Sequence, residues 1–119
     1  MTGDDFRRLA LDLNDAIEGA HMGHPDFRAG NGRIFASLTA AEDWAVVMIT
    51  PDEQKALITS DPDVFVPAAG AWGRQGCTKI WLQSAVKSDV RGALTLAWER
   101  IGTMPASRTK KRRPSGKAR

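Results

Sequence analysis

The chain has 119 residues, of which 42% are hydrophobic and 26% charged, values typical of one globular domain with no room for a second. A domain of this length can bury enough apolar surface to be stable without a disulfide. Its single cysteine, Cys77, excludes a disulfide within the chain. No stretch approaches the roughly 18 apolar residues of a membrane span, and residues 1–13 do not resemble a secretory signal. We therefore expect a soluble, cytoplasmic protein.

The net charge of +3 conceals a division between the body of the chain and its C-terminal end. Residues 105–119 hold seven Lys or Arg and no acid, so residues 1–104 hold the remaining 10 basic residues against 14 acids, a net charge of −4. We predict a folded domain over residues 1–104. Residues 105–119 are predicted to form a disordered basic tail that binds nucleic acid non-specifically at low salt. Its central cations are Lys110, Lys111, Arg112 and Arg113.

Three segments carry the signals of helices. The first is predicted over residues 4–18, where apolar residues recur every three or four positions. The second covers residues 50–60, because Thr50 and Glu53 have the spacing of a capping box. The third covers residues 88–102, which begin with a cap and end at a glycine.

The other segments have the composition of strands. The Gly-Asn-Gly at residues 30–32 favours a tight hairpin between two of them, because Gly and Asn tolerate positive φ. The predicted strands are residues 24–29, 33–38, 44–49 and 77–83, with a shorter one within 64–68 or 71–74. The resulting order is α-β-β-β-α-β-β-α. It predicts an α+β domain with helices packed on one antiparallel sheet.

Few residues could support catalysis or hold a metal. His21 and His24 form an H-x-x-H pair with Asp26 nearby, but zinc needs three or four ligands and such short patterns are usually structural. Cys77 as a nucleophile would need a base, and nothing in the sequence places His24 within reach. A buried structural thiol is the favoured interpretation. We predict no enzyme, metal site or cofactor.

The segment GAWGRQG, residues 70–76, lacks the pattern of a P-loop and that of a dinucleotide fingerprint. It is predicted to be a bending loop at the sheet edge. Two interpretations stay open: Trp72 covers the core and Arg74 is an ordinary solvated arginine, or the loop is a wing whose side chains contact phosphates. The residues predicted to make such contacts are Arg28, Arg33, Trp72, Arg74 and Lys79.

Three stretches together resemble the MmcQ/YjbR-like family of small bacterial proteins. They are HMGHPDFRAGNGRIFASL, WAVVMITPDEQKAL and PAAGAWGRQGCTKIWL, and the resemblance covers about residues 4–101. It implies a secretion-chaperone-like or frataxin-like α+β fold, and DNA binding through a double-wing motif with no shared catalytic residues. The family's motif positions fall on His24, Asp26, Phe27, Trp72, Gly73, Gly76, Thr78 and Ile80. Cys77 stands where a larger apolar residue, often tryptophan, is expected in this family.

These observations predict a non-enzymatic protein that binds DNA with weak sequence preference. Sequence readout is expected to be weak because the last predicted helix has only Arg91 and Arg100 outside its apolar stripe. The alternative is a protein-interaction or chaperone-like adaptor domain without a nucleic-acid role, which the acidic balance of residues 1–104 favours.

Overall fold

The computed structural model describes residues 1–106. Lys110, Lys111, Arg112 and Arg113 lie outside the described residues, as does most of the predicted tail. The strands are β1 (Ile17–His21), β2 (His24–Arg28), β3 (Ile34–Leu38), β4 (Trp44–Met48), β5 (Phe65–Pro67) and β6 (Cys77–Trp81). The helices are α1 (Gly3–Leu11), α2 (Pro51–Ser60), α3 (Gly70–Arg74) and α4 (Lys87–Gly102), with a 3-10 turn at Leu82–Ser84.

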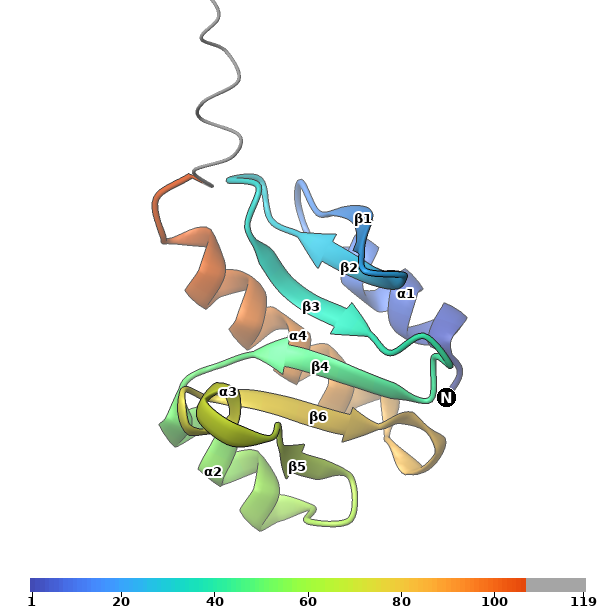
Figure 1. Ribbon diagram of the computed structural model, residues 1–119. Helices are drawn as coiled ribbons and strands as arrows, with labels where there is room; N and C mark the ends of the chain where they lie inside the picture. The colour runs from blue at the N-terminus through green and yellow to red at the C-terminus, as the bar shows by residue number, and fades with distance from the viewer. Residues whose placement is uncertain (107–119) are drawn as a thin grey trace, which may run out of the picture.

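The six strands form one antiparallel sheet in the order β1-β2-β3-β4-β6-β5. Helices α1 and α4 cover one face of this sheet and lie behind it in Figure 1, while α2 packs beside β5. The core lies between these layers. There Phe6 of α1 meets Phe27 of β2 edge to face, with ring centroids 5.8 Å apart, and Leu94 of α4 is buried with Ile80 of β6. The predicted α+β fold, with helices on one antiparallel sheet, is confirmed.

Most predicted elements are present. The segments predicted at 24–29, 33–38, 44–49, 64–68 and 77–83 contain β2, β3, β4, β5 and β6. Helix α2 begins with the predicted capping box: the Thr50 hydroxyl accepts from the Glu53 amide at 3.1 Å, and the Glu53 carboxylate accepts from the Thr50 amide at 3.0 Å. Helix α4 ends at the predicted glycine and begins one residue before the predicted cap.

The predicted first helix was too long, and the predicted order lacked one strand. Helix α1 ends at Leu11, and Asp15 has a φ of 61°, which an α-helix cannot contain. Residues Ile17–His21 form β1 instead and pair with β2 across a two-residue turn with φ values of 50° and 79°, the geometry of a tight hairpin. The strand was missed because the apolar spacing of α1 continues into it.

The glycine-rich segment is the short helix α3, where a loop or strand was predicted. Gly70, its first residue, and Gly76, which follows it, have φ values of 65° and 111°, a backbone region that residues other than glycine rarely adopt. Gly73 approaches the backbone so closely that a Cβ there would overlap the carbonyl oxygen of Ala68. The backbone therefore requires these glycines, and their spacing follows from a compact helical turn between β5 and β6.

Candidate binding groove

The strand register identifies which side chains lie on the sheet face opposite α1 and α4, here called the open face. Phe27 points to the helices, so its neighbour Asp26 points to the open face, because successive side chains of a strand alternate. Asp26 lies opposite Ser37, Ser37 opposite Val46 and Val46 opposite Lys79. These four side chains therefore form one row across the open face.

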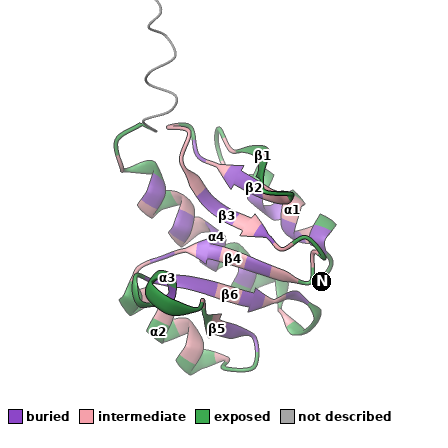
Figure 2. Cartoon of the chain, in the orientation of Figure 1, coloured by how far each residue is buried: buried purple, intermediate pink, exposed green. Residues whose placement is uncertain are grey.

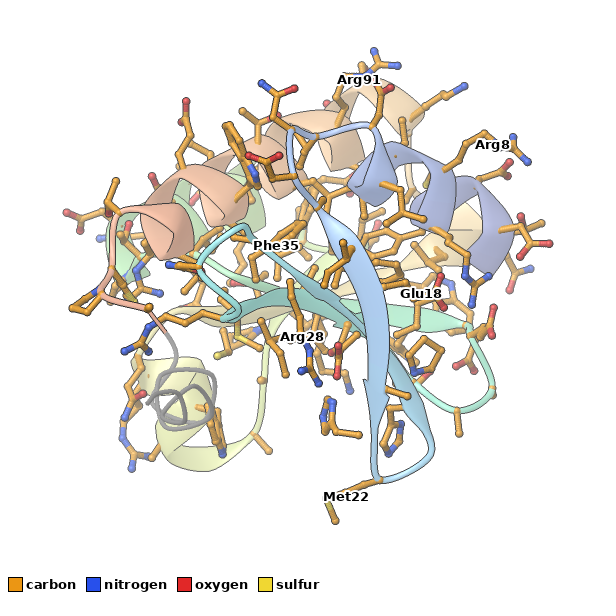
Figure 3. All side chains as sticks on the ribbon, turned by 90° about the horizontal axis from the view of Figure 1, so that it is seen from above. Arg8, Glu18, Met22, Arg28, Phe35 and Arg91 are labelled. Atoms are coloured by element: carbon orange, nitrogen blue, oxygen red, sulfur yellow. The ribbon has the colours of Figure 1, made fainter. Side chains whose placement is uncertain are left out.

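A groove lies on the open face between the β1–β2 hairpin and α3. Figure 3 shows both projecting on the side away from α1 and α4, with Met22 at the hairpin tip, and Figure 2 shows that β1 and α3 are largely exposed whereas β2 is not. The groove has a volume of about 640 Å³, and Met22 and Trp72 are among its lining residues. A neighbouring hollow of about 360 Å³ shares the lining residues His21, Trp72, Met48 and Cys77 with it.

Two apolar side chains of this lining are unusually exposed. Met22 is 91% exposed at the hairpin tip, and Trp72 is 66% exposed on α3. Large apolar side chains in such positions often mark a binding surface. The expectation that Trp72 covers the core is therefore wrong, since this indole faces the groove and solvent.

A hydrogen-bonded network of three side chains lies on the β1–β2 hairpin, and one of them, His21, lines the groove. The Asp26 carboxylate is fully buried and accepts from His21 Nδ1 at 2.8 Å and from Arg28 Nε and Nη2 at 2.9 and 3.1 Å. Burial opposes ionisation of Asp26, but the hydrogen bonds from Arg28 and His21 outweigh it, so its pKa lies below the ordinary value. Because a carboxylate only accepts, Nδ1 of His21 is the donor and Nε2 is left for a ligand.

The predicted contact residues gather on or beside the open face, and they differ in whether their side chains are already bound to other groups. Arg28 is held by Asp26, and Arg33 donates from Nε to the Pro105 carbonyl at 2.6 Å while lining the groove. Lys79 Nζ lies 4.3 Å from the centroid of a Trp44 ring. Arg74 is exposed at the end of α3, and within residues 1–106 its guanidinium has no hydrogen-bond or ion-pair partner.

Aromatic rings also gather on this face. Trp44 and Trp81 are opposite one another on β4 and β6, and their ring centroids are 4.9 Å apart. Both are half-buried, and both lie two residues along their strands from the central row that contains Lys79. This pair was not predicted as part of the site, although period-two spacing from Lys79 was a usable signal. His21 was considered as a possible metal ligand and not as a contact residue, because the pairing of β1 with β2 was not predicted.

The charges of the described residues are segregated. Within residues 1–106, two carboxylates lie on strands, those of Glu18 and Asp26. Glu18 is opposite Phe27, so it points to the helix side, where Arg7 Nε donates to it at 2.9 Å. Asp26 is neutralised by its own partners. The acidic surplus of residues 1–104 lies instead in three loops, which contain Asp12, Asp15, Glu42, Asp43, Asp61 and Asp63.

The remaining candidates are the possible metal ligands and the thiol of Cys77. In the part of the chain that is described, no three of His, Cys, Asp and Glu are placed to hold a metal ion. Cys77 donates from Sγ to Met48 Sδ at 3.2 Å. Burial raises the pKa of its thiol, an effect that the charge of Arg100 opposes only in part. Over residues 1–106, no helix combines the length and apolarity that crossing a membrane requires.

The fold has a solved counterpart. The chain superposes on the crystal structure of Deinococcus radiodurans protein DR2400, which carries the domain DUF419, with a TM-score of 0.74 over 93% of this chain and 86% of that one. The two sequences are 13% identical, so the likeness shows a common fold. DUF419 is related to the MmcQ/YjbR family. No protein-family model and no curated protein matches this sequence.

Proposed function

We propose that this chain is a non-enzymatic member of the MmcQ/YjbR-like group that binds DNA in the groove of its open face. The observation that carries the proposal is the segregation of charge. The one carboxylate on the open face, Asp26, is paired with Arg28 and His21, whereas Arg33, Lys79 and Arg74 lie on or beside this face without a carboxylate partner among the described residues. A body with a net charge of −4 thus presents a cationic surface.

The binding would act mainly through phosphates. Among the predicted contact residues within 1–106, Arg74 is the cation whose side chain has no partner, and it would form charge-assisted hydrogen bonds with phosphate oxygens. Lys79 would add a point charge in the central row, and Arg28 would contribute less because Asp26 already holds its guanidinium. The long helices lie on the other face or beside the sheet, so base readout by a recognition helix is not part of this mode. Weak sequence preference follows.

The basic residues 107–119 would strengthen the same interaction. Pro105, two residues before them, accepts a hydrogen bond from Arg33 at the groove. Lys110, Lys111, Arg112 and Arg113 would add sequence-independent affinity that falls steeply with salt.

The second candidate function is a protein-interaction domain. The exposed thioether of Met22 and the exposed indole of Trp72 favour it, because flexible methionines and aromatic anchors are common at protein interfaces. A protein ligand would dock between these two side chains, and its binding would depend little on salt.

The proposal is tested by fluorescence anisotropy of labelled DNA, single-stranded and duplex, across a salt series. The full chain is compared with a tail variant in which all seven Lys and Arg residues of positions 105–119 are replaced by Gln, namely Arg108, Lys110, Lys111, Arg112, Arg113, Lys117 and Arg119. We expect the variant to keep binding. In that background Arg74→Ala should make the negative slope of log K against log salt less steep by about 0.7 to 0.9, because this is the contribution of one phosphate contact.

The matched control is Arg91→Ala, which removes an exposed arginine from α4 on the opposite side of the sheet, as Figure 3 shows. It should leave the slope unchanged. If the tail variant binds neither form of DNA, the folded domain is not a DNA-binding domain and the protein-interaction function becomes the better one.

A further inference from the structure

We infer that the groove takes single-stranded DNA in preference to duplex DNA, with one base stacked on Trp72 in the groove and the strand continuing over the open face toward Trp44 and Trp81. This inference rests on the proposed function and specifies its ligand. Three of the four tryptophans of the chain lie on the open face, namely Trp44, Trp72 and Trp81. The fourth, Trp98, is on α4, where its Nε1 donates to the Asn14 carbonyl at 3.1 Å.

Trp72 is the principal stacking platform. Its indole is 66% exposed, lines both hollows of the groove and has no hydrogen-bond partner among the described residues. An exposed indole costs free energy in water, and a base that covers it removes that cost. Stacking on aromatic side chains tolerates any base, in agreement with weak sequence preference.

The pair Trp44 and Trp81 offers a second platform with a cation attached. Lys79 Nζ lies 4.3 Å from the centroid of the Trp44 ring, so a positive charge stands beside the aromatic surface. A nucleotide complements this arrangement, because its flat base can stack on the aromatic ring while its negative phosphate meets the positive charge. Sites for single strands combine cations with aromatic rings on which bases stack. The pair lies outside the groove lining, at the end of the β4–β6 ladder away from Met48 and Cys77, so a strand would reach it by running across the open face.

The shape and charge of the walls argue against a duplex ligand. A wing that enters a groove of duplex DNA needs cations near its tip to meet the two phosphate backbones. The β1–β2 hairpin has Met22 and Gly23 at its tip, and its single Lys or Arg is Arg28, at the end far from the turn and bound to Asp26. The groove volume of about 640 Å³ is that of sites for single small molecules, a scale that suits unpaired nucleotides.

His21 adds a polar contact within the groove. Its Nδ1 is held by the buried Asp26 carboxylate at 2.8 Å, which fixes the ring and leaves Nε2 to bond with a base or phosphate. The contact would be directional, because the histidine cannot rotate without breaking this hydrogen bond.

The test uses the full-length tail variant defined above, so that the folded domain is measured. Labelled oligothymidine of about twelve nucleotides, a length within the range of single-strand sites, is compared with a duplex of equal length by anisotropy and by quenching of tryptophan fluorescence. We expect the single strand to bind at least about tenfold more tightly and to quench the fluorescence. Trp72→Ala should weaken single-strand binding by at least about fivefold, and Trp72→Phe should restore much of the loss.

Three results would overturn the inference. If the duplex binds as tightly as the single strand and Trp72→Ala changes neither, DNA binding stands but base stacking does not. If polyphosphate competes as well as oligothymidine at equal charge, the groove recognises phosphate alone. If oligouridine binds more than about tenfold more tightly than oligothymidine, the ligand is RNA. Loss of all binding in the tail variant would overturn the proposed function itself.

Discussion

The guanidinium of Arg28 binds both carboxylate oxygens of Asp26, with Nε to Oδ1 at 2.9 Å and Nη2 to Oδ2 at 3.1 Å. The two residues are neighbours on the same face of β2, and Asp26 is fully buried although it lies on the open face. A bidentate pair of this kind holds both side chains in one geometry. It also explains how a carboxylate can lie on the same sheet face as a groove proposed to bind an anion.

Asp26→Asn should therefore destabilise the protein in a manner that depends on pH. The folded-state pKa of Asp26 is below its unfolded value near 3.9, so the stabilisation is complete well above about pH 4 and is lost as the pH falls through the folded pKa. At neutral pH we expect a loss of about 2 kcal/mol, less than for a fully buried pair because Arg28 and His21 are partly exposed.

The difference is measured by urea unfolding of both proteins at neutral pH and at the lowest pH where both still fold. Asp63→Asn, in an exposed loop, is the control and should change the free energy of unfolding little. A loss that is equal at both pH values would show that the carboxylate charge does not stabilise the fold.

The glycines of the chain should respond in opposite directions to substitution. Gly76 has a φ of 111°, and a Cβ there would overlap the carbonyl oxygen of Ile49, so Gly76→Ala should cost at least about 2 kcal/mol. Gly92 lies in α4, where a Cβ would have nothing within 4 Å, so Gly92→Ala should stabilise by roughly 0.5–1 kcal/mol. Thermal unfolding of the two variants compares them directly. The same sign for both would contradict the structural assignment.

Asn31 fixes the end of α4 to the β2–β3 turn. Its Nδ2 donates to the carbonyl oxygens of Ile101 and Met104 at 2.8 and 3.0 Å, and its Oδ1 accepts from the Arg33 amide at 3.0 Å. Asn31→Asp removes the donor and places a negative charge beside helix C-terminal carbonyls. We expect a loss of about 2 kcal/mol, read from chemical denaturation. Stability within about 0.5 kcal/mol of the parent would mean that these bonds contribute little.

The thiol of Cys77 should be unreactive in the folded protein. Burial raises its pKa, and the thiolate is the form that reacts. Alkylation by iodoacetamide near pH 8 should be at least about tenfold slower than in the same protein unfolded in urea, as followed by mass spectrometry. Equal rates in the two states would mean that the thiol is accessible and ionises normally.

Sequence patterns predicted the elements whose signals are local. The capping box of Thr50 and Glu53 placed α2, and runs of branched apolar residues placed β4 and β6. Strand β1 was not predicted because its residues, Ile17–His21, include few with high β-propensity, and their strand conformation depends on pairing with β2. Helix α3 was not predicted because its conformation depends on close backbone contacts and not on residues that favour a helix.

The same limit applies to the candidate site. Arg28, Trp72 and Lys79 were predicted as members of one surface, and the structure places all three on the open face. The network of His21 with Asp26 was not predicted, since it requires the β1–β2 pairing that the sequence did not reveal. Residue types can suggest the chemistry of a site, whereas register decides which of them meet.

The three loops that carry the acidic surplus would influence how a polyanion approaches the open face. They connect α1 to β1, β3 to β4 and α2 to β5, and in the projection of Figure 1 they lie around the edge of the sheet. A polyanion that binds the open face as proposed would be repelled by these loops if it arrived off centre, and attracted by the cations between them. Such a field sets the orientation and the rate of an encounter more than its final strength. Neutralising the loop carboxylates would then leave the contacts intact while making first collisions less selective.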